Sequence, residues 1–367
     1  MNIKDLDFTF PEDLIATKPQ WPPRVMWVDA RGKSSEISFA QLLSMIPPGD
    51  ALLINDTQVL KRRVFAGRSL QAAKDIEVLF LNSLGSQQWE VLFPAKSLSL
   101  GAKLYLPDQV GKNGVVQKIS MTLIQKGRPQ KVKIEVFSEE DLVPMDADIG
   151  EDYFSMVAEL PLPPYIQKAR SERHNVEQDK NWYQTAWATK PGSFAAPTAS
   201  LHFRSEDIQS LKDRGVQVLP LTLHVGLGTF LPVTTEKLED HVMHAEYIEI
   251  PCATIKALQQ VKAAGGRVWT LGSTATRSIE SWAQGLLKED TVNQCYKGFS
   301  DLFIQPGYKY NTVDFLMTNF HQPQSTLVAM VAAFAGLDQV RQAYQWAIEN
   351  RFRLFSYGDF SVWQKAE

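Results

Sequence analysis

The chain has 367 residues, a net charge of −3 and an ordinary composition, with 44% hydrophobic and 22% charged residues. This length suffices for two domains with cores that need no disulfide or metal. Cys252 and Cys295 form no CxxC pair, which indicates a reducing compartment and no zinc ribbon. We expect a cytoplasmic protein without membrane contact, because the N-terminus does not resemble a signal peptide and the longest apolar run, 327–337, is too short to cross a bilayer.

The first 65 residues have a mixed α/β pattern. Residues 25–28 are a candidate strand, and residues 39–46 have helical spacing that ends at two prolines. The continuous apolar run 51–54 predicts a buried parallel strand. Asn55, Asp56 and Thr57 follow it, where a parallel strand would open into an active-site loop.

Residues 66–151 have a different pattern. Short, partly alternating segments are separated by Gly, Pro, Asn and Asp, with no convincing helix between them; they are 76–80, 89–93, 119–123 and 132–136. This pattern predicts a small antiparallel β-barrel inserted into the main domain.

The α/β pattern returns at residue 152. Strands are predicted at 216–225 and 267–271, and helices at 253–264, 275–287, 327–335 and 337–349. The predicted fold is therefore an α/β catalytic domain of residues 1–65 and 152–367, carrying an inserted small antiparallel β-barrel domain of residues 66–151.

Common ligand-binding motifs are absent. Gly226 and Gly228 begin like a dinucleotide-binding loop, but Leu231 stands where the last glycine is needed. His241, His244 and Glu246 do not have the HExxH spacing of a helical zinc site, so we interpret these histidines as hydrogen-bonding groups and predict no metal.

Polar residues gather next to two predicted helix starts. Ser325 is a candidate N-cap, and the amides of that first turn could bind a carboxylate or phosphate. Capping alone explains Ser325 but not the neighbouring Asn319 and His321. Thr274 and Arg277 lie at the other helix start, although Arg277 could equally face solvent or a structural carboxylate.

An ordered set of motifs spans nearly the whole chain and resembles one family. The set is similar to the S-adenosylmethionine:tRNA ribosyltransferase-isomerases of queuosine biosynthesis. The matching segments are 55–57, 160–166, 183–185, 195–198, 201–203, 221–230, 243–246, 272–281, 301–308, 318–321, 333–336 and 355–359.

The resemblance implies a particular reaction. The acceptor would be tRNA carrying 7-aminomethyl-7-deazaguanine at the wobble position. The ribosyl part of S-adenosylmethionine would be transferred and isomerised to give epoxyqueuosine, with release of adenine and methionine. The family uses S-adenosylmethionine as a co-substrate and needs no metal, and it combines an α/β domain with an inserted β-barrel.

This chemistry suggests roles for the residues within the motifs. A sulfonium acidifies the adjacent 5′ carbon, which calls for a base of near-neutral pKa, and histidine suits this best. Two of the four motif histidines are expected to be catalytic; these are His202, His224, His244 and His321.

The leaving groups need partners as well. Asp56 or Asn319 could donate to the departing adenine, and Arg277 or a helix N-terminus could bind the methionine carboxylate. Asn55, Thr274 and Ser325 complete the expected cofactor-binding set. We expect these side chains and the histidines to converge on one cleft.

The chain departs from the family mainly at basic positions. Relatives usually have Arg at the positions of Gln58 and Leu231, Lys at Gln324 and Leu at Gln322, and Ser200 replaces a usual glycine. The cluster of Lys61, Arg62 and Arg63 is therefore expected to bind RNA, in a weak and salt-sensitive contact with the tRNA anticodon loop.

Two alternatives stay open at this point. One is a diverged relative that binds RNA or a nucleoside without this catalysis. The other is an S-adenosylmethionine-dependent enzyme that acts on a small molecule. The retained His and Asn motifs favour catalysis on tRNA, and we expect a monomer.

Overall fold

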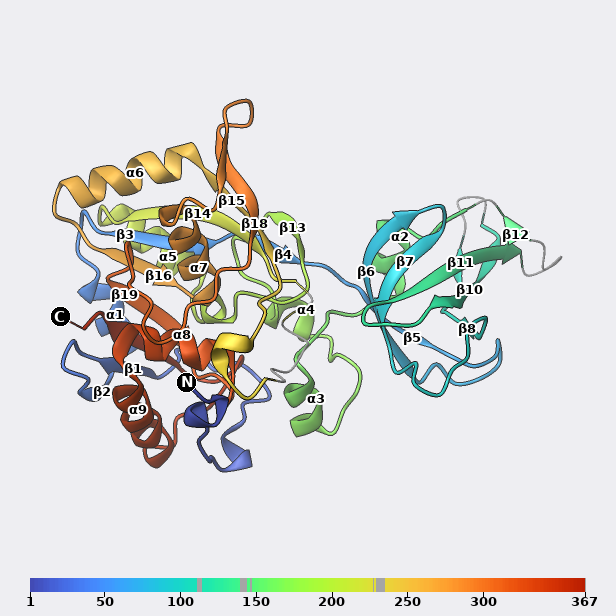
Figure 1. Cartoon of the computed structure of the whole chain (residues 1–367), viewed down its shortest axis with the longest axis horizontal. Coiled ribbons are helices and arrows are strands. Elements are labelled where there is room, and N and C mark those ends of the chain that lie inside the picture. Colours follow the sequence, from blue (N-terminus) through green and yellow to red (C-terminus); the bar gives the residue numbers. More distant parts are fainter. Residues whose placement is uncertain (111–113, 139–143, 146, 227, 229–234, 367) are drawn as a thin grey trace. The chain divides into compact units, whose positions relative to one another are not determined.

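The computed structural model describes residues 1–110, 114–138, 144–145, 147–226, 228 and 235–366 (Figure 1). The chain divides into two compact units, Met1–Val59 with Leu162–Glu367, and Leu60–Pro161. The predicted fold class, an α/β main domain with an inserted antiparallel β-barrel, is confirmed.

The helices and short 3-10 turns belong almost entirely to the first unit; α2 belongs to the second. The α-helices are α1 (Phe39–Met45), α2 (Glu151–Val157), α3 (Pro164–Arg170), α4 (Asp179–Trp182), α5 (Ser205–Asp213), α6 (Cys252–Ala263), α7 (Ser273–Ala283), α8 (Thr326–Ala335) and α9 (Leu337–Glu349). The 3-10 turns include η1 (Ile3–Leu6), η2 (Glu12–Leu14), η3 (Thr198–His202) and η5 (Leu238–Asp240). Within the described ranges, no helix has both the length and the apolar character that a bilayer span requires.

A mixed sheet forms the centre of the first unit. Its spatial order is β17 (Lys288–Asp290), β18 (Cys295–Ser300), β15 (Glu246–Pro251), β14 (Gln217–His224), β3 (Ala51–Asn55), β16 (Val268–Leu271), β19 (Phe315–Asn319), β20 (Phe360–Gln364), β1 (Val25–Val28) and β2 (Ser34–Ile37). The four central strands β14, β3, β16 and β19 are parallel to one another, so their carboxyl ends meet at one edge, here called the carboxyl edge.

Alternate residues of the central strands face two apolar layers. Leu53 and Leu221 pack with α6 and α7, whereas Leu52 and Ile54 pack with α5 and η3. A strand buried on both faces has the continuous apolar pattern of residues 51–54, which is why this strand could be predicted. Beyond β3, the expected loop at Thr57 is instead a short strand, β4 (Thr57–Val59), paired in parallel with β13 (Lys190–Ser193).

The second unit is an antiparallel barrel. Its strand order is β5 (Arg63–Ala66), β6 (Ile76–Gly85), β7 (Gln88–Leu92), β11 (Gln130–Ser138), β10 (Val116–Gln125) and β8 (Lys103–Tyr105), with β9 (Gln109–Val110) beside β10 and β12 (Pro144–Met145) beside β11. Two backbone hydrogen bonds of 2.8 Å between Gly67 and Tyr105 join the end of β5 to β8, which closes the barrel.

The unit is longer than the segment 66–151 expected from the sequence. It begins earlier because β5 pairs with β6 along its whole length. It ends later because Tyr153 and Phe154 of α2 belong to the barrel core. An alternating pattern marks strands but does not show which flanking residues pack against them.

Candidate functional site

Polar residues stand at the carboxyl edge after each of the four central strands. Asp56 follows β3, His224 ends β14, Ser273 and Thr274 begin α7 after β16, and Asn319 ends β19. Ligands of open α/β sheets bind at this edge, because loops and helix starts meet there. The site is described strand by strand below.

Asn55 is completely buried at the end of β3 and is bonded to backbone. Its Nδ2 donates to the carbonyl of Leu223 at 3.0 Å, while its Oδ1 accepts from the amides of Leu223 and Thr57, both at 3.1 Å. Asn55 therefore ties β3 to β14. Both polar atoms of this amide are bonded to backbone, which suits a positioning role, and the cofactor contact expected for Asn55 stays a prediction.

Asp56 and His224 lie on the same side of the sheet. The Thr222 hydroxyl donates to Oδ1 of Asp56 at 2.6 Å, and the Thr57 hydroxyl lies 2.7 Å from Nδ1 of His224. Burial raises the pKa of the Asp56 carboxyl, since desolvation outweighs its hydrogen bond from Thr222. Burial lowers the pKa of His224, partly opposed by the charge of Asp56.

Residues of β13 and β15 pack closely around the His224 ring. A Cβ at Gly192 would lie 2.7 Å from Nε2 of His224, so only glycine leaves room for the ring in this orientation. The imidazole also stacks on Tyr247, with ring centroids 5.8 Å apart and planes inclined by 18°. These contacts fix the direction in which Nε2 points.

His202 and His321 are buried and poorly suited to act as bases. Nδ2 of Asn319 donates to Nε2 of His202 at 3.0 Å, and the His202 ring stacks on Phe360. Nε2 of His321 lies 2.7 Å from the hydroxyl of Thr318. Burial lowers the pKa of each imidazole to about 3, so both stay neutral at physiological pH.

His244 is in a different environment from the other three. It is exposed and packs against Gly228, where an added Cβ would lie 3.0 Å from the His244 ring. The four histidines thus do not form a single cluster. His224 is half-buried and oriented, which makes it the best-placed candidate base.

Arg277 is held by a buried ion pair. Its Nη1 pairs with Glu246, its Nε donates to the carbonyl of Leu302 at 3.3 Å, and the other oxygen of Glu246 accepts from the amide of Gly226 at 2.9 Å. Glu246 therefore connects the loop after His224 to helix α7. Its carboxylate is committed to these contacts, and in the described part of the chain no three His, Cys, Asp or Glu side chains lie together as metal ligands would.

Four buried polar atoms at this edge have no hydrogen-bond partner among the described residues. They are Oγ of Ser200, Oγ1 of Thr274, Nη2 of Arg277 and Oδ1 of Asn319. A Cβ placed on Gly272 would be 3.6 Å from Cβ of Ala199 and 3.8 Å from Oγ1 of Thr274, which brings η3 close to the start of α7.

Buried polar groups are normally hydrogen-bonded, because leaving them unpaired costs free energy. Because these two hydroxyls, the amide oxygen and the guanidinium nitrogen are buried and unpaired at one edge, they are candidate contacts for a polar ligand. Ser200 was noted in the sequence only because it replaces a usual glycine, and its unpaired hydroxyl now makes it a candidate ligand contact.

Ser325 caps α8, as predicted. Its hydroxyl accepts from the amide of Val328 at 3.3 Å and donates to the carbonyl of Gln322 at 2.7 Å. Both hydrogen-bonding directions are used by local backbone. Capping thus accounts for Ser325, and a ligand contact there has no support beyond the helix start itself.

The expected RNA-binding cluster is not an exposed basic patch, which corrects our prediction for Arg62 and Arg63. They are 5% and 1% exposed, and they pair with Glu151 and Glu159 of the same unit. Only Lys61 is exposed. Charge along the sequence does not reveal carboxylates that the fold brings close, so the two arginines are structural.

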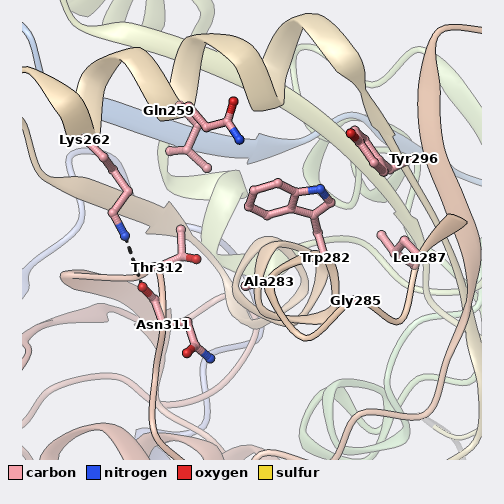
Figure 2. A pocket seen from close by; sticks show the side chains of 10 residues that line it. Gln259, Lys262, Trp282, Ala283, Gly285, Leu287, Tyr296, Asn311 and Thr312 are labelled. Atoms are coloured by element: carbon pink, nitrogen blue, oxygen red, sulfur yellow. Dashed lines mark hydrogen bonds between the residues drawn. The ribbon is translucent and has the colours of Figure 1, made fainter. Parts of the chain in front are cut away.

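A cleft of about 490 Å³ lies away from these residues (Figure 2). Trp282, Tyr296 and Lys262 line it, and the Lys262 ammonium donates to the carbonyl of Asn311 at 3.0 Å. Asn311 precedes β19 and Lys262 lies in the last turn of α6, so the cleft is at the opposite edge of the sheet. None of the predicted site residues lines it.

Sequence reasoning missed several residues that shape the site. Thr222 and Tyr247 orient Asp56 and His224, yet a threonine and a tyrosine within strands carry no distinctive signal. Glu246 was noted as part of a motif, but its pairing with Arg277 depends on tertiary contact. Leu231 and most of the segment that follows Gly228 lie outside the described residues.

An α/β sheet with an oriented imidazole, a carboxyl of raised pKa and open polar atoms at its carboxyl edge has the features of an enzyme active site. The chain belongs to the queuosine biosynthesis protein family, whose model matches residues 3–362. The family resemblance inferred from the sequence is thereby confirmed.

Two relatives match over nearly their entire length. The chain is 38% identical over 365 residues to the S-adenosylmethionine:tRNA ribosyltransferase-isomerase of Halothermothrix orenii, which covers 98% of each protein. The crystal structure of the S-adenosylmethionine tRNA ribosyltransferase of Thermotoga maritima matches with a TM-score of 0.52 and 26% identity, covering 98% of this chain and 99% of that one.

Proposed function

We propose that this chain transfers the ribosyl part of S-adenosylmethionine to 7-aminomethyl-7-deazaguanine at the wobble position of tRNA and isomerises it, giving epoxyqueuosine, adenine and methionine. Family membership and the activity named for the Halothermothrix orenii relative support this proposal. The structural observation that supports it best is the set of four unpartnered buried atoms at the carboxyl edge.

Those atoms suit the polar groups of the donor. Nη2 of Arg277 is a buried cationic donor without a partner, which fits the methionine carboxylate. Oδ1 of Asn319 is an open acceptor, which fits the exocyclic amine of adenine. The hydroxyls of Ser200 and Thr274 can each donate or accept, as contacts to ribose hydroxyls require.

The same edge offers an acid and a base. His224 is neutral at physiological pH because burial lowers its pKa, so its Nε2 can accept the proton that leaves the 5′ carbon. The pKa of Asp56 is raised above that of an ordinary aspartate, which makes its protonated form easier to reach, and Asp56 is the candidate acid for the departing adenine. Asn55, Thr57 and Thr222 hold these two groups in place. His244 remains a proposed second base, since the structure leaves it exposed.

The remaining expectations stay predictions. They are the anticodon loop as the RNA contact, a cytoplasmic location, a monomeric state and activity without a metal. Of the three residues predicted to contact RNA, only Lys61 is retained in this proposal.

A mass-spectrometric assay tests the reaction. The protein is incubated with S-adenosylmethionine and tRNA bearing the aminomethyl base, and tRNA with guanine at the wobble position is the matched control. We expect adenine release together with an equal amount of modified wobble nucleoside. Adenine release without RNA product would favour a small-molecule acceptor, and RNA binding without adenine release would favour a non-catalytic relative.

A further inference from the structure

Three rings lie in a row across one face of the sheet beyond β14. In the antiparallel register, His224 of β14 is opposite Tyr247 of β15, and Tyr247 is opposite Phe299 of β18. The centroid distances are 5.8 Å for the first pair and 5.6 Å for the second. We call these three residues the aromatic row; it starts at the proposed base on β14 and crosses β15 to β18. Figure 1 shows these three strands next to one another.

Among the described residues, the two faces of these strands are covered differently, and β13 packs over the second face only near His224 and Glu249. Ile248 and Ile250 point into the core beneath α6 and α7. On the other face, Phe299 is 72% exposed, and a hollow of about 490 Å³ extends over Tyr247, Phe299 and the neighbouring β17–β18 hairpin. The Tyr247 and Phe299 rings are inclined by 66°, so it is the exposed ring of Phe299, beside the hollow, that offers an apolar face to a planar partner.

A second row of residues on the same face carries charge. Lys297 lies opposite Glu249 and next to Lys288 in the register. Lys297 pairs with Asp290 at 2.6 Å, and Lys190 lies 3.7 Å from Glu249. Since carboxylates offset most of the lysine charge, this face is suited to contacts with bases rather than to strong attraction of phosphates.

We propose that Tyr247 and Phe299, the outer part of the aromatic row, are a stacking platform for unpaired anticodon-loop bases next to the target nucleotide. This inference rests on the proposed function, because that reaction requires a single-stranded loop to reach the carboxyl edge. Proteins read such loops by stacking bases on aromatic side chains displayed on a sheet, and the aromatic row is continuous with the proposed base His224. The platform would hold the loop while the target base leaves its stack.

The test is the replacement Phe299→Ala, with Val292→Ala as the matched control. Val292 is 89% exposed in the turn between β17 and β18, and it is not in the row. Loss of one base–aromatic contact should raise the Kd and KM for the tRNA about tenfold. The kcat and the KM for S-adenosylmethionine should not change, and Phe299→Trp should restore the affinity. Val292→Ala should behave as wild type.

The outcomes separate this proposal from the proposed function. Wild-type protein that fails to modify tRNA would overturn the proposed function. An active wild type with an equally active and equally tight-binding Phe299→Ala variant would overturn the platform alone. Light scattering measures the oligomeric state of both proteins. If the wild type is a dimer, the variant is a monomer and the RNA affinity is unchanged, this face serves self-association and the platform is overturned. Thermal unfolding confirms that each variant is folded.

Discussion

Replacing Asn55 with alanine distinguishes a positioning role from a ligand contact. The side chain is completely buried and makes three hydrogen bonds to the backbone of Leu223 and Thr57. At roughly 1 kcal/mol net for each bond, and more where a buried partner stays unsatisfied, Asn55→Ala should cost about 3 to 5 kcal/mol of unfolding free energy. This is a large part of the total stability of an ordinary domain, about 5 to 15 kcal/mol.

Urea unfolding of the main unit, followed by tryptophan fluorescence, measures this loss, and isothermal titration measures the affinity for S-adenosylmethionine under conditions where the variant is folded. Asn350→Ala is the control, because Asn350 is exposed and its Nδ2 makes one helix-end bond. We expect a lower midpoint for Asn55→Ala at an unchanged slope, with donor affinity retained. Unaltered stability together with weakened donor binding would refute the positioning role.

Four further outcomes are expected. Arg277→Met should raise the KM for S-adenosylmethionine by about ten- to a hundredfold, as loss of a charge-assisted hydrogen bond does, and an unchanged KM in steady-state assays would remove Arg277 from donor binding. Because the folded-state pKa of His202 is depressed to about 3, its contribution to stability is complete above the unfolded value near 6.5 and is lost as the pH falls toward 3. His202→Gln should therefore reduce the slope of unfolding free energy against pH between pH 5 and 6.5 by up to about 1.4 kcal/mol per pH unit. Urea midpoints measured at several pH values check this, and an unchanged slope would contradict it. Gly192→Ala should lower kcat by displacing the ring of His224, which rapid-quench kinetics can check; full activity would mean that the orientation of His224 is unimportant. Arg63→Ala should destabilise the barrel while leaving RNA affinity intact in filter binding, and a large loss of affinity in a folded variant would reinstate the basic cluster.

The order of elements could be predicted from the sequence because burial imposes its periodicity locally. The run 51–54 is apolar at every position, as a strand covered on both faces must be, and the segments of the barrel alternate because one face of each strand is buried. The N-cap at Ser325 could also be predicted, because capping depends on neighbours within a few residues. Family membership also followed from the ordered motifs.

The roles of the site residues depend on partners far apart in the chain. Asn55 meets Leu223 across 168 positions, and His202 meets Asn319 across 117. Arg62 and Arg63 look like a basic patch until the fold places Glu151 and Glu159 beside them. A sequence therefore determined which chemical groups this protein has and which segments are strands or helices. Only the tertiary structure decided which groups are exposed, paired or left open to a ligand, because desolvation and hydrogen bonding are set by neighbours in space.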